Sequence, residues 1–209
     1  MNLKKIMVFF LLLCLAGCRN SEESAYYKEK LNSYRFAENT YVLLEKKDSK
    51  AANIAVAANR DLALISIYND SYQIDQYYQD KTEYCYLKGP NTEETFYRLS
   101  IEQMFEDPMD IYKKMVMDPA DIANIEYLET VNEDGKELDH IKGKISSQEM
   151  HFYWNRNTDD LERIVFKDGS ILLIEHRELS LPKEFKEAVE TDSETINAFI
   201  EEFTGTINE

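Results

Sequence analysis

Residues 62–88 read LALISIYNDSYQIDQYYQDKTEYCYLK. Three short runs rich in tyrosine, isoleucine and leucine follow one another here, and polar turn residues at 69–71 and 79–81 separate them. Short runs joined by tight polar turns are typical of an antiparallel meander. The same rhythm extends from Thr40 to Leu99 and predicts five or six strands of one sheet.

The first of these runs places apolar residues on both faces of its predicted strand. Leu62 and Leu64 point one way and Ile65 and Ile67 the other, because successive side chains of a strand alternate. An antiparallel sheet that is open to water on one side alternates apolar and polar residues more cleanly. We therefore expect a sheet that is covered on both sides or that lines a cavity.

A second group of strands is predicted after residue 125. The Asp-Gly dipeptides at 134–135 and 168–169 each predict a two-residue type I′ hairpin turn, and residues 157–159 predict a looser turn. The strands expected between these signals are 125–131, 137–146, 150–155, 161–167 and 170–177.

Helices are predicted before, between and after the two groups of strands. Residues 24–32 fit one or two helical turns. The segments DPMD at 107–110 and DPAD at 118–121 each combine a capping aspartate, a proline suited to the first turn and a second acid near the positive end of the helix dipole. A final helix is expected after Asp192 or Ser193. The fold class is therefore α+β.

The first eighteen residues have the pattern of a bacterial lipoprotein signal. Lys4 and Lys5 precede an apolar run over 6–16, which is about half of the roughly 20 residues that span a bilayer. The run leads into Leu-Ala-Gly-Cys at 15–18, which resembles the lipobox of bacterial lipoproteins. The resemblance implies removal of residues 1–17, attachment of acyl chains such as palmitate at Cys18, a short tether over 18–24 and a single domain over 25–209. The alternative is an ordinary signal peptide with an incidental cysteine.

Composition limits the partners of the mature chain. Loss of residues 1–17 would leave 22 basic residues against 40 acidic ones. This acidity excludes a nucleic-acid partner, and the lipid rather than charge would have to hold the protein at a membrane. Cys85 would be the one cysteine left besides Cys18, so no internal disulfide is possible, and we expect Cys85 to be a small buried apolar residue.

No motif indicates an enzyme, a metal or a cofactor. His140, His151 and His176 lie in separate predicted strands, without a metal-binding spacing. A polar run, NRNTD, begins like a calcium loop, but Asp160 and Phe166 stand where that loop requires glycine and glutamate, so a hairpin turn is expected. Glycine-rich phosphate loops and nucleophile motifs are missing from the sequence. We expect a non-enzymatic protein.

The order of the predicted elements resembles the LolA/LolB-type superfamily of lipoprotein carriers and related lipid-binding lipoproteins. Behind the lipobox come a helix, five or six strands, a helical insertion and five more strands. The segment FYWN at 152–155, a turn and LERI at 161–164 are similar to the late strand pair of that family. The resemblance implies a strongly curved antiparallel sheet of about 10–11 strands, an open half-barrel with helices covering its concave face.

A ligand-binding hollow is also implied by this resemblance. Aromatic and flexible apolar side chains suit such a hollow, although they suit an ordinary core as well. The expected lining residues are Tyr84, Tyr86, Met115, Phe152, Trp154 and Val165.

The sequence leaves three functional hypotheses. The first is a membrane-anchored extracytoplasmic lipoprotein that binds a lipid or other hydrophobic ligand between the sheet and the helices. The alternative is a cell-envelope interaction or sensor module with a filled core and a protein partner. An enzyme acting on extracellular polymers is a third hypothesis. The expected location is the outer face of the cell membrane in a Gram-positive cell, or the outer membrane in a Gram-negative one.

Overall fold

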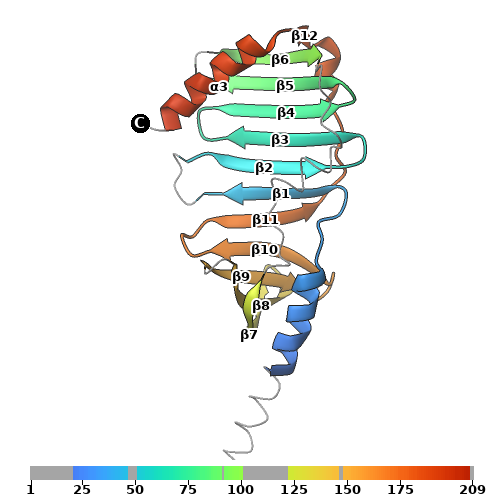
Figure 1. Ribbon diagram of the computed structural model, residues 1–209, viewed down its shortest axis with the longest axis vertical. Coiled ribbons are helices and arrows are strands. Elements are labelled where there is room, and N and C mark those ends of the chain that lie inside the picture. Colours follow the sequence, from blue (N-terminus) through green and yellow to red (C-terminus); the bar gives the residue numbers. More distant parts are fainter. Residues whose placement is uncertain (1–20, 47–50, 91, 101–121, 146–147, 208–209) are drawn as a thin grey trace, which may run out of the picture. The chain divides into compact units, whose positions relative to one another are not determined.

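A computed structural model describes residues 21–46, 51–90, 92–100, 122–145 and 148–207 (Figure 1). The chain forms two compact units. The described residues within Met1–Arg35 and Asp118–Lys167 make up the first unit, and those within Phe36–Met117 and Asp168–Glu209 make up the second. Both are built mainly from antiparallel strands.

The second unit contains the meander predicted from the sequence. Its strands follow the order β12-β6-β5-β4-β3-β2-β1-β11, which is linear and does not close on itself (Figure 1). All described pairs are antiparallel except that of β12 with β6. The elements are β1 (Thr40–Glu45), β2 (Asn53–Ala58), β3 (Leu62–Tyr68), β4 (Gln73–Gln79), β5 (Thr82–Gly89), β6 (Thr92–Ser100), β11 (Ile171–His176), η2 (Lys183–Glu187), β12 (Val189–Glu190) and α3 (Ser193–Ile207).

Helix α3 packs on one face of this sheet. Asp192 caps its start, since the Oδ1 atom accepts a hydrogen bond from the backbone N–H of Thr195 at 3.0 Å. The apolar stripe of α3 then packs against β4 and β5. The buried residues of this core are Tyr72, Ile74, Cys85, Leu87, Ile196, Phe199 and Phe203.

The first unit is a smaller sheet with a helix packed on it. Its strands follow the order β10-β9-β8-β7 and all three pairs are antiparallel. The elements are the helix over residues 21–33, here called the N-terminal helix, and β7 (Ala123–Glu133), β8 (Lys136–Ile145), β9 (Gln148–Asn155) and β10 (Asp160–Phe166).

The N-terminal helix is buried along one side. Tyr27 and Leu31 lie one helical turn apart and are almost fully buried. The ring of Tyr27 stacks on that of Tyr127 and lies 6.1 Å from that of Trp154, centroid to centroid. The helix therefore belongs to the core of this unit.

Several sequence predictions are confirmed. The α+β class, the antiparallel sheet and a final helix starting at Ser193 are all present. Asp134 and Gly135 have φ values of 50° and 79°, as a type I′ turn requires. Cys85 is a fully buried free cysteine.

One local prediction needs correction, and one short strand was missed. Asp168 does not adopt the positive φ of a type I′ turn; only Gly169 does, at 86°. Asp168 instead accepts a hydrogen bond on Oδ1 from the backbone N–H of Ser170 at 2.9 Å. The two-residue β12, which is parallel to β6, was not predicted because it has no alternating run of its own.

Other predictions stay open. The helices expected after 107 and 118 fall within 101–121, outside the described residues. The strong curvature, the helices over a concave face and the single domain over 25–209 remain predictions. No helix in the described part of the chain is long and apolar enough to cross a bilayer.

Candidate functional site

A pocket of about 340 Å³ lies on one face of the second unit, here called the tyrosine pocket. The strands β1, β3 and β4 provide most of its walls, and the residue following β11 completes it. Its lining residues are Tyr41, Leu64, Ser66, Tyr68, Gln73, Asp75, Tyr77 and Arg177.

The pocket exists because a strand of small residues separates two strands of large ones. Ala57 in β2 is paired with Tyr41 on one side and Leu64 on the other, and Leu64 is paired with Tyr77. Directly paired residues share a face of the sheet, so alanine lies between the large side chains. This face is opposite to the one that packs on α3, which carries Ile74 and Cys85.

Arg177 supplies the positive charge of the pocket. Its guanidinium carbon lies 3.3 Å from the centre of the Tyr41 ring, a cation–π contact that fixes the group over the aromatic face. The Arg177 guanidinium has no carboxylate partner in the part of the chain that the structure describes.

Asp75 supplies the carboxylate of the pocket, and both of its oxygens accept hydrogen bonds. The Ser66 hydroxyl donates to Oδ1 at 2.5 Å, and the Gln73 amide donates to Oδ2 at 2.8 Å. Burial raises the pKa of Asp75, while these two hydrogen bonds oppose the rise. Each oxygen of Asp75 thus accepts one hydrogen bond, and the carboxylate is held in place on one wall of the pocket.

The tyrosine hydroxyls of the pocket remain neutral at physiological pH. Burial raises the pKa of Tyr41 and of Tyr68, and it raises the pKa of Tyr77 to about 12. A neutral phenol offers both a donor and an acceptor above a large apolar ring. The three residues thus combine apolar area with polar tips.

An aromatic cluster adjoins the pocket at Tyr77. Phe185 from η2 is buried, and its ring centre lies 5.4 Å from that of Tyr77, 5.6 Å from that of Tyr84 and 5.1 Å from that of Phe96. These edge-on contacts fix η2 on the pocket face of the sheet.

A larger hollow, of about 770 Å³, lies at the β5, β6 and β12 end of the same unit. Its arginine, Arg98, is already paired with Glu190 at 3.1 Å, and Tyr84 is its one aromatic lining residue. The tyrosine pocket, with an unpaired guanidinium and three rings, is the stronger candidate for ligand binding.

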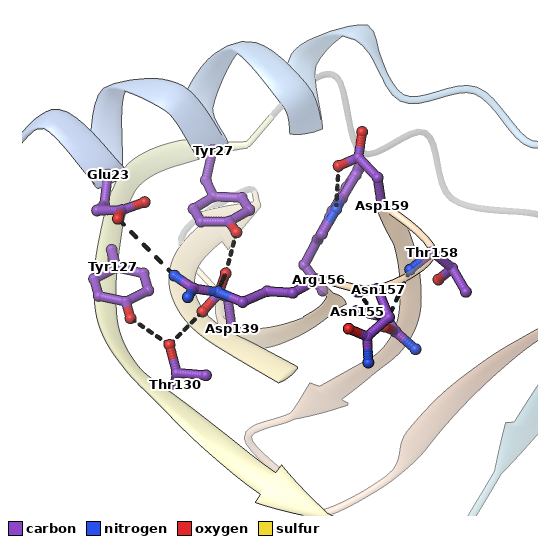
Figure 2. A network of polar contacts seen from close by, with 11 residues as sticks. Glu23, Tyr27, Tyr127, Thr130, Asp139, Asn155, Arg156, Asn157, Thr158 and Asp159 are labelled. Carbon is purple, nitrogen blue, oxygen red and sulfur yellow. Dashed lines mark hydrogen bonds and ion pairs between the residues drawn. The ribbon is translucent and has the colours of Figure 1, made fainter. Parts of the chain in front are cut away.

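The first unit holds a polar network below the N-terminal helix (Figure 2). Asp139 on β8 is fully buried and accepts hydrogen bonds from the Tyr27 hydroxyl, from the Thr130 hydroxyl at 2.6 Å and from Arg156 Nε at 2.6 Å. Arg156 also lies 4.0 Å from Glu23 of the helix. A buried carboxylate with three donors ties the helix to the sheet.

A second set of polar contacts holds the N-terminal helix to the sheet, one turn further along the helix. Lys30 Nζ is 2.5 Å from Asp159 Oδ2, and the Trp154 indole N–H donates to Asp159 Oδ1 at 3.0 Å. The Lys30 ammonium, above all, holds the pKa of Asp159 below its usual range. The polar run NRNTD is thus a turn that holds the helix, with Asn155 accepting hydrogen bonds from the backbone N–H groups of two following residues.

The residues predicted to line a ligand hollow are distributed over both units. In the second unit, Tyr84 contacts Phe185 and Tyr86 contacts Phe96, on the face of the tyrosine pocket but outside its lining. In the first unit, Phe152 and Trp154 are core residues, and Val165 is paired with His151 on the opposite face of that sheet. Met115 lies outside the described residues.

Sequence reasoning did not single out Tyr41, Asp75 or Arg177. Each stands in a separate strand or loop, and only the register of β1, β3 and β4 with their neighbours brings them together. Near each of these residues the sequence shows only the alternation of a strand, which does not indicate a binding site. Two of the three histidines, His140 and His151, also become neighbours in the structure.

Comparisons with known proteins give only distant likenesses, all of them to solved structures. No family profile and no curated protein matches the sequence. The lipoprotein LppX of Mycobacterium tuberculosis aligns over 80% of this chain and 97% of its own, with 17% identity and a TM-score of 0.43. PNGF-II aligns over 79% of this chain and 34% of its own, with 12% identity and a TM-score of 0.31. A DUF1329 family protein from Desulfovibrio piger aligns over 79% and 95%, with 9% identity and a TM-score of 0.23.

At these TM-scores the likenesses carry no argument about function. The resemblance to the LolA/LolB-type superfamily stays a prediction, and the functional hypothesis depends on the geometry of the chain itself.

Proposed function

We propose that this chain is a membrane-anchored extracytoplasmic lipoprotein that binds an amphiphilic molecule in the tyrosine pocket, without catalysis. The anionic head of the ligand would contact Arg177, and its apolar part would lie against the rings of Tyr41, Tyr68 and Tyr77. The observation that carries the proposal is a guanidinium fixed over an aromatic ring, with no ion-pair partner among the described residues, in a concave aromatic site.

The composition of the lining supports an amphiphile over a purely apolar ligand. Leu64 is the one aliphatic lining residue; the others have polar or charged groups. An arginine pairs with carboxylate or phosphate through a planar fork of donors, which gives strength and orientation. Fatty acids and phospholipids both carry such a head group.

The proposed anchor is consistent with the position of the N-terminal helix. Two residues separate Cys18 from Ser21, where the described helix begins. The Cα atoms of Cys18 and Ser21 can therefore be at most about 11 Å apart. The network at Asp139 ties this helix to the first unit. Lipidation at Cys18 would therefore hold the first unit close to the membrane surface.

Binding of a fluorescent fatty acid tests the proposal. The chain over residues 19–209 is expected to take up one probe molecule, and Arg177→Gln is expected to weaken binding about 10-fold, since a hydrogen bond to a charged group contributes roughly 1.5 kcal/mol or more. Arg60→Gln is the matched control, because Arg60 is an exposed arginine outside the pocket. Equal affinity of the two variants would contradict the proposed site.

The alternative function is an envelope interaction or sensor module. Such a module would present an apolar surface to a protein partner. The exposed large hydrophobic side chains of the described residues are Tyr26 and Val189, which belong to different units. Failure of the chain to bind any amphiphile would favour this alternative, and cross-linking in intact cells would then identify the partner.

A further inference from the structure

The tyrosine pocket contains one carboxylate and one guanidinium that do not pair with each other. Asp75 and Arg177 both line the pocket, but no ion pair joins them, and no other described residue forms an ion pair with either. Each group is held by neutral neighbours: the ring of Tyr41 holds Arg177, and Ser66 and Gln73 hold Asp75. A ligand that carries both charges could therefore contact both groups at once.

Asp75 lies among tyrosine side chains on the pocket face of the sheet. Its direct partners on the neighbouring strands β3 and β5 are Ser66 and Tyr86 (Figure 1). Directly paired residues share a face of the sheet, and so does Tyr77, which is two positions further along β4. The faces of aromatic rings attract cations. A carboxylate bordered by two such rings is therefore suited to a cationic group.

The Asp75 carboxylate can still accept hydrogen bonds from a ligand. A carboxylate has about four acceptor positions. The Ser66 hydroxyl and the Gln73 amide use one position on each oxygen. A primary ammonium group brings three N–H donors to the remaining positions, whereas a quaternary ammonium group has none. The pocket therefore favours a primary amine over a choline-like head.

Other carboxylates lie within electrostatic reach of the pocket. Burial, above all, raises the pKa of Tyr68, and the charge of Glu45 adds to the rise. Burial is also the main cause of the raised pKa of Tyr77, and the charges of Asp75 and Glu184 add to it. A ligand with anionic charge alone would bring a further negative charge close to these carboxylates, whereas an ammonium group in the same ligand offsets them.

We propose that the ligand of the tyrosine pocket is a phospholipid with a zwitterionic aminoethyl phosphate head. Its phosphate contacts Arg177, since the planar guanidinium fork matches phosphate oxygens, and its primary ammonium contacts Asp75. This inference rests on the proposed function and narrows it, from amphiphiles with any anionic head to those that also carry an amine. The contacts are non-covalent, and no bond of the lipid changes.

Binding of two lysophospholipids with the same acyl chain tests the head group. One has an aminoethyl phosphate head and the other a glycerol phosphate head. Isothermal titration calorimetry measures their Kd values, below the micelle concentrations, with the chain over residues 19–209, which contains every described residue. The aminoethyl lipid is expected to bind about 10-fold more tightly or better, as expected for one added hydrogen bond between charged groups.

Two variants assign the preference to Asp75. In Asp75→Asn, the amide oxygen can accept from Gln73, and the amide nitrogen can donate to the Ser66 hydroxyl, so the wall keeps its shape. The ratio of the two Kd values is expected to fall to about one. Asp70→Asn makes the same change at an exposed position in the turn between β3 and β4, and it is expected to keep the ratio of the unsubstituted chain. Circular dichroism checks that both variants are folded.

The outcomes separate this inference from the proposed function. Binding of both lipids with equal Kd values would overturn the zwitterionic head and leave an amphiphile-binding pocket. Binding of neither lipid would overturn both. A preference that persists in Asp75→Asn would overturn the contact assigned to Asp75. Free aminoethyl phosphate that binds as tightly as the lipid would support the two charged contacts and overturn the amphiphile.

Discussion

Replacement of Asp139 by asparagine is expected to loosen the N-terminal helix from the first unit. The carboxylate accepts from Tyr27 and Arg156 on Oδ2 and from Thr130 on Oδ1. Asparagine keeps one carbonyl oxygen, which can take the place of Oδ2 and serve the first two donors. Its amide nitrogen then faces Thr130, whose hydroxyl can rotate to accept. The variant therefore keeps the shape of the network and loses its charge.

The size of the effect follows from the exposure of the partners. Hydrogen bonds to charged groups contribute roughly 1.5–3 kcal/mol, against about 1 kcal/mol for neutral ones. The Arg156 side chain is 35% exposed and can be solvated again, which reduces the loss. We expect Asp139→Asn to lower the free energy of unfolding of the first unit by about 2 kcal/mol, and Asp139→Ala, which leaves buried donors unsatisfied, by roughly 3–5 kcal/mol.

Tryptophan fluorescence during urea unfolding measures the effect. The protein has one tryptophan, Trp154, whose ring centre lies 6.1 Å from that of Tyr27 and 5.7 Å from that of Tyr34. Its emission therefore reports on docking of the N-terminal helix. Asp134→Asn is the control, because it makes the same change at an exposed turn of the same unit. A midpoint for Asp139→Asn equal to that of Asp134→Asn would refute the role assigned to the network.

Three further predictions concern other contacts. Gly143→Ala is expected to destabilise the first unit by about 1–3 kcal/mol in the same assay, because the added methyl would lie 2.6 Å from Ile122 Cγ2; an unchanged midpoint would contradict this close packing. Acid is expected to weaken the ion pair between Lys30 and Asp159, because the pKa of Asp159 is lowered in the folded chain. The contribution of this pair to the free energy of unfolding is therefore present above the ordinary aspartate pKa, and it is lost as the pH falls through the pKa of the folded chain. The low-pH change in tryptophan emission should then be absent in Asp159→Asn. In a chain starting at residue 19, Cys85 is expected to resist alkylation at pH 8 until denaturant is added, because burial raises the pKa of its thiol; rapid labelling of the folded chain would contradict its burial against α3.

The strands could be predicted from the sequence because their signals are local. Alternation and turn residues between Thr40 and Leu99 indicated β1 to β6, and the aspartate at 192 marked the start of α3 through its capping hydrogen bond. The turn at Asp168 was predicted wrongly, since an Asp-Gly pair is compatible with more than one turn and the surrounding chain decides among them.

The candidate sites could not be predicted because they depend on register. Tyr41 and Tyr77 share a face of the sheet only because β1 is paired with β2, β2 with β3 and β3 with β4 at particular residues. A shift of one residue in any pair would turn one of these side chains to the other face. The same holds for His140 and His151, which a single sequence places in different strands without indicating that they meet.

Native mass spectrometry of the chain over residues 19–209, purified from a bacterial host without denaturant, shows whether the tyrosine pocket holds a ligand. We expect one amphiphile with a carboxylate or phosphate head per chain, present in the Arg60→Gln variant and depleted in Arg177→Gln. A chain that carries no such molecule, and that stays free of ligand after incubation with fatty acid or phospholipid, would contradict the assignment of the tyrosine pocket as a binding site.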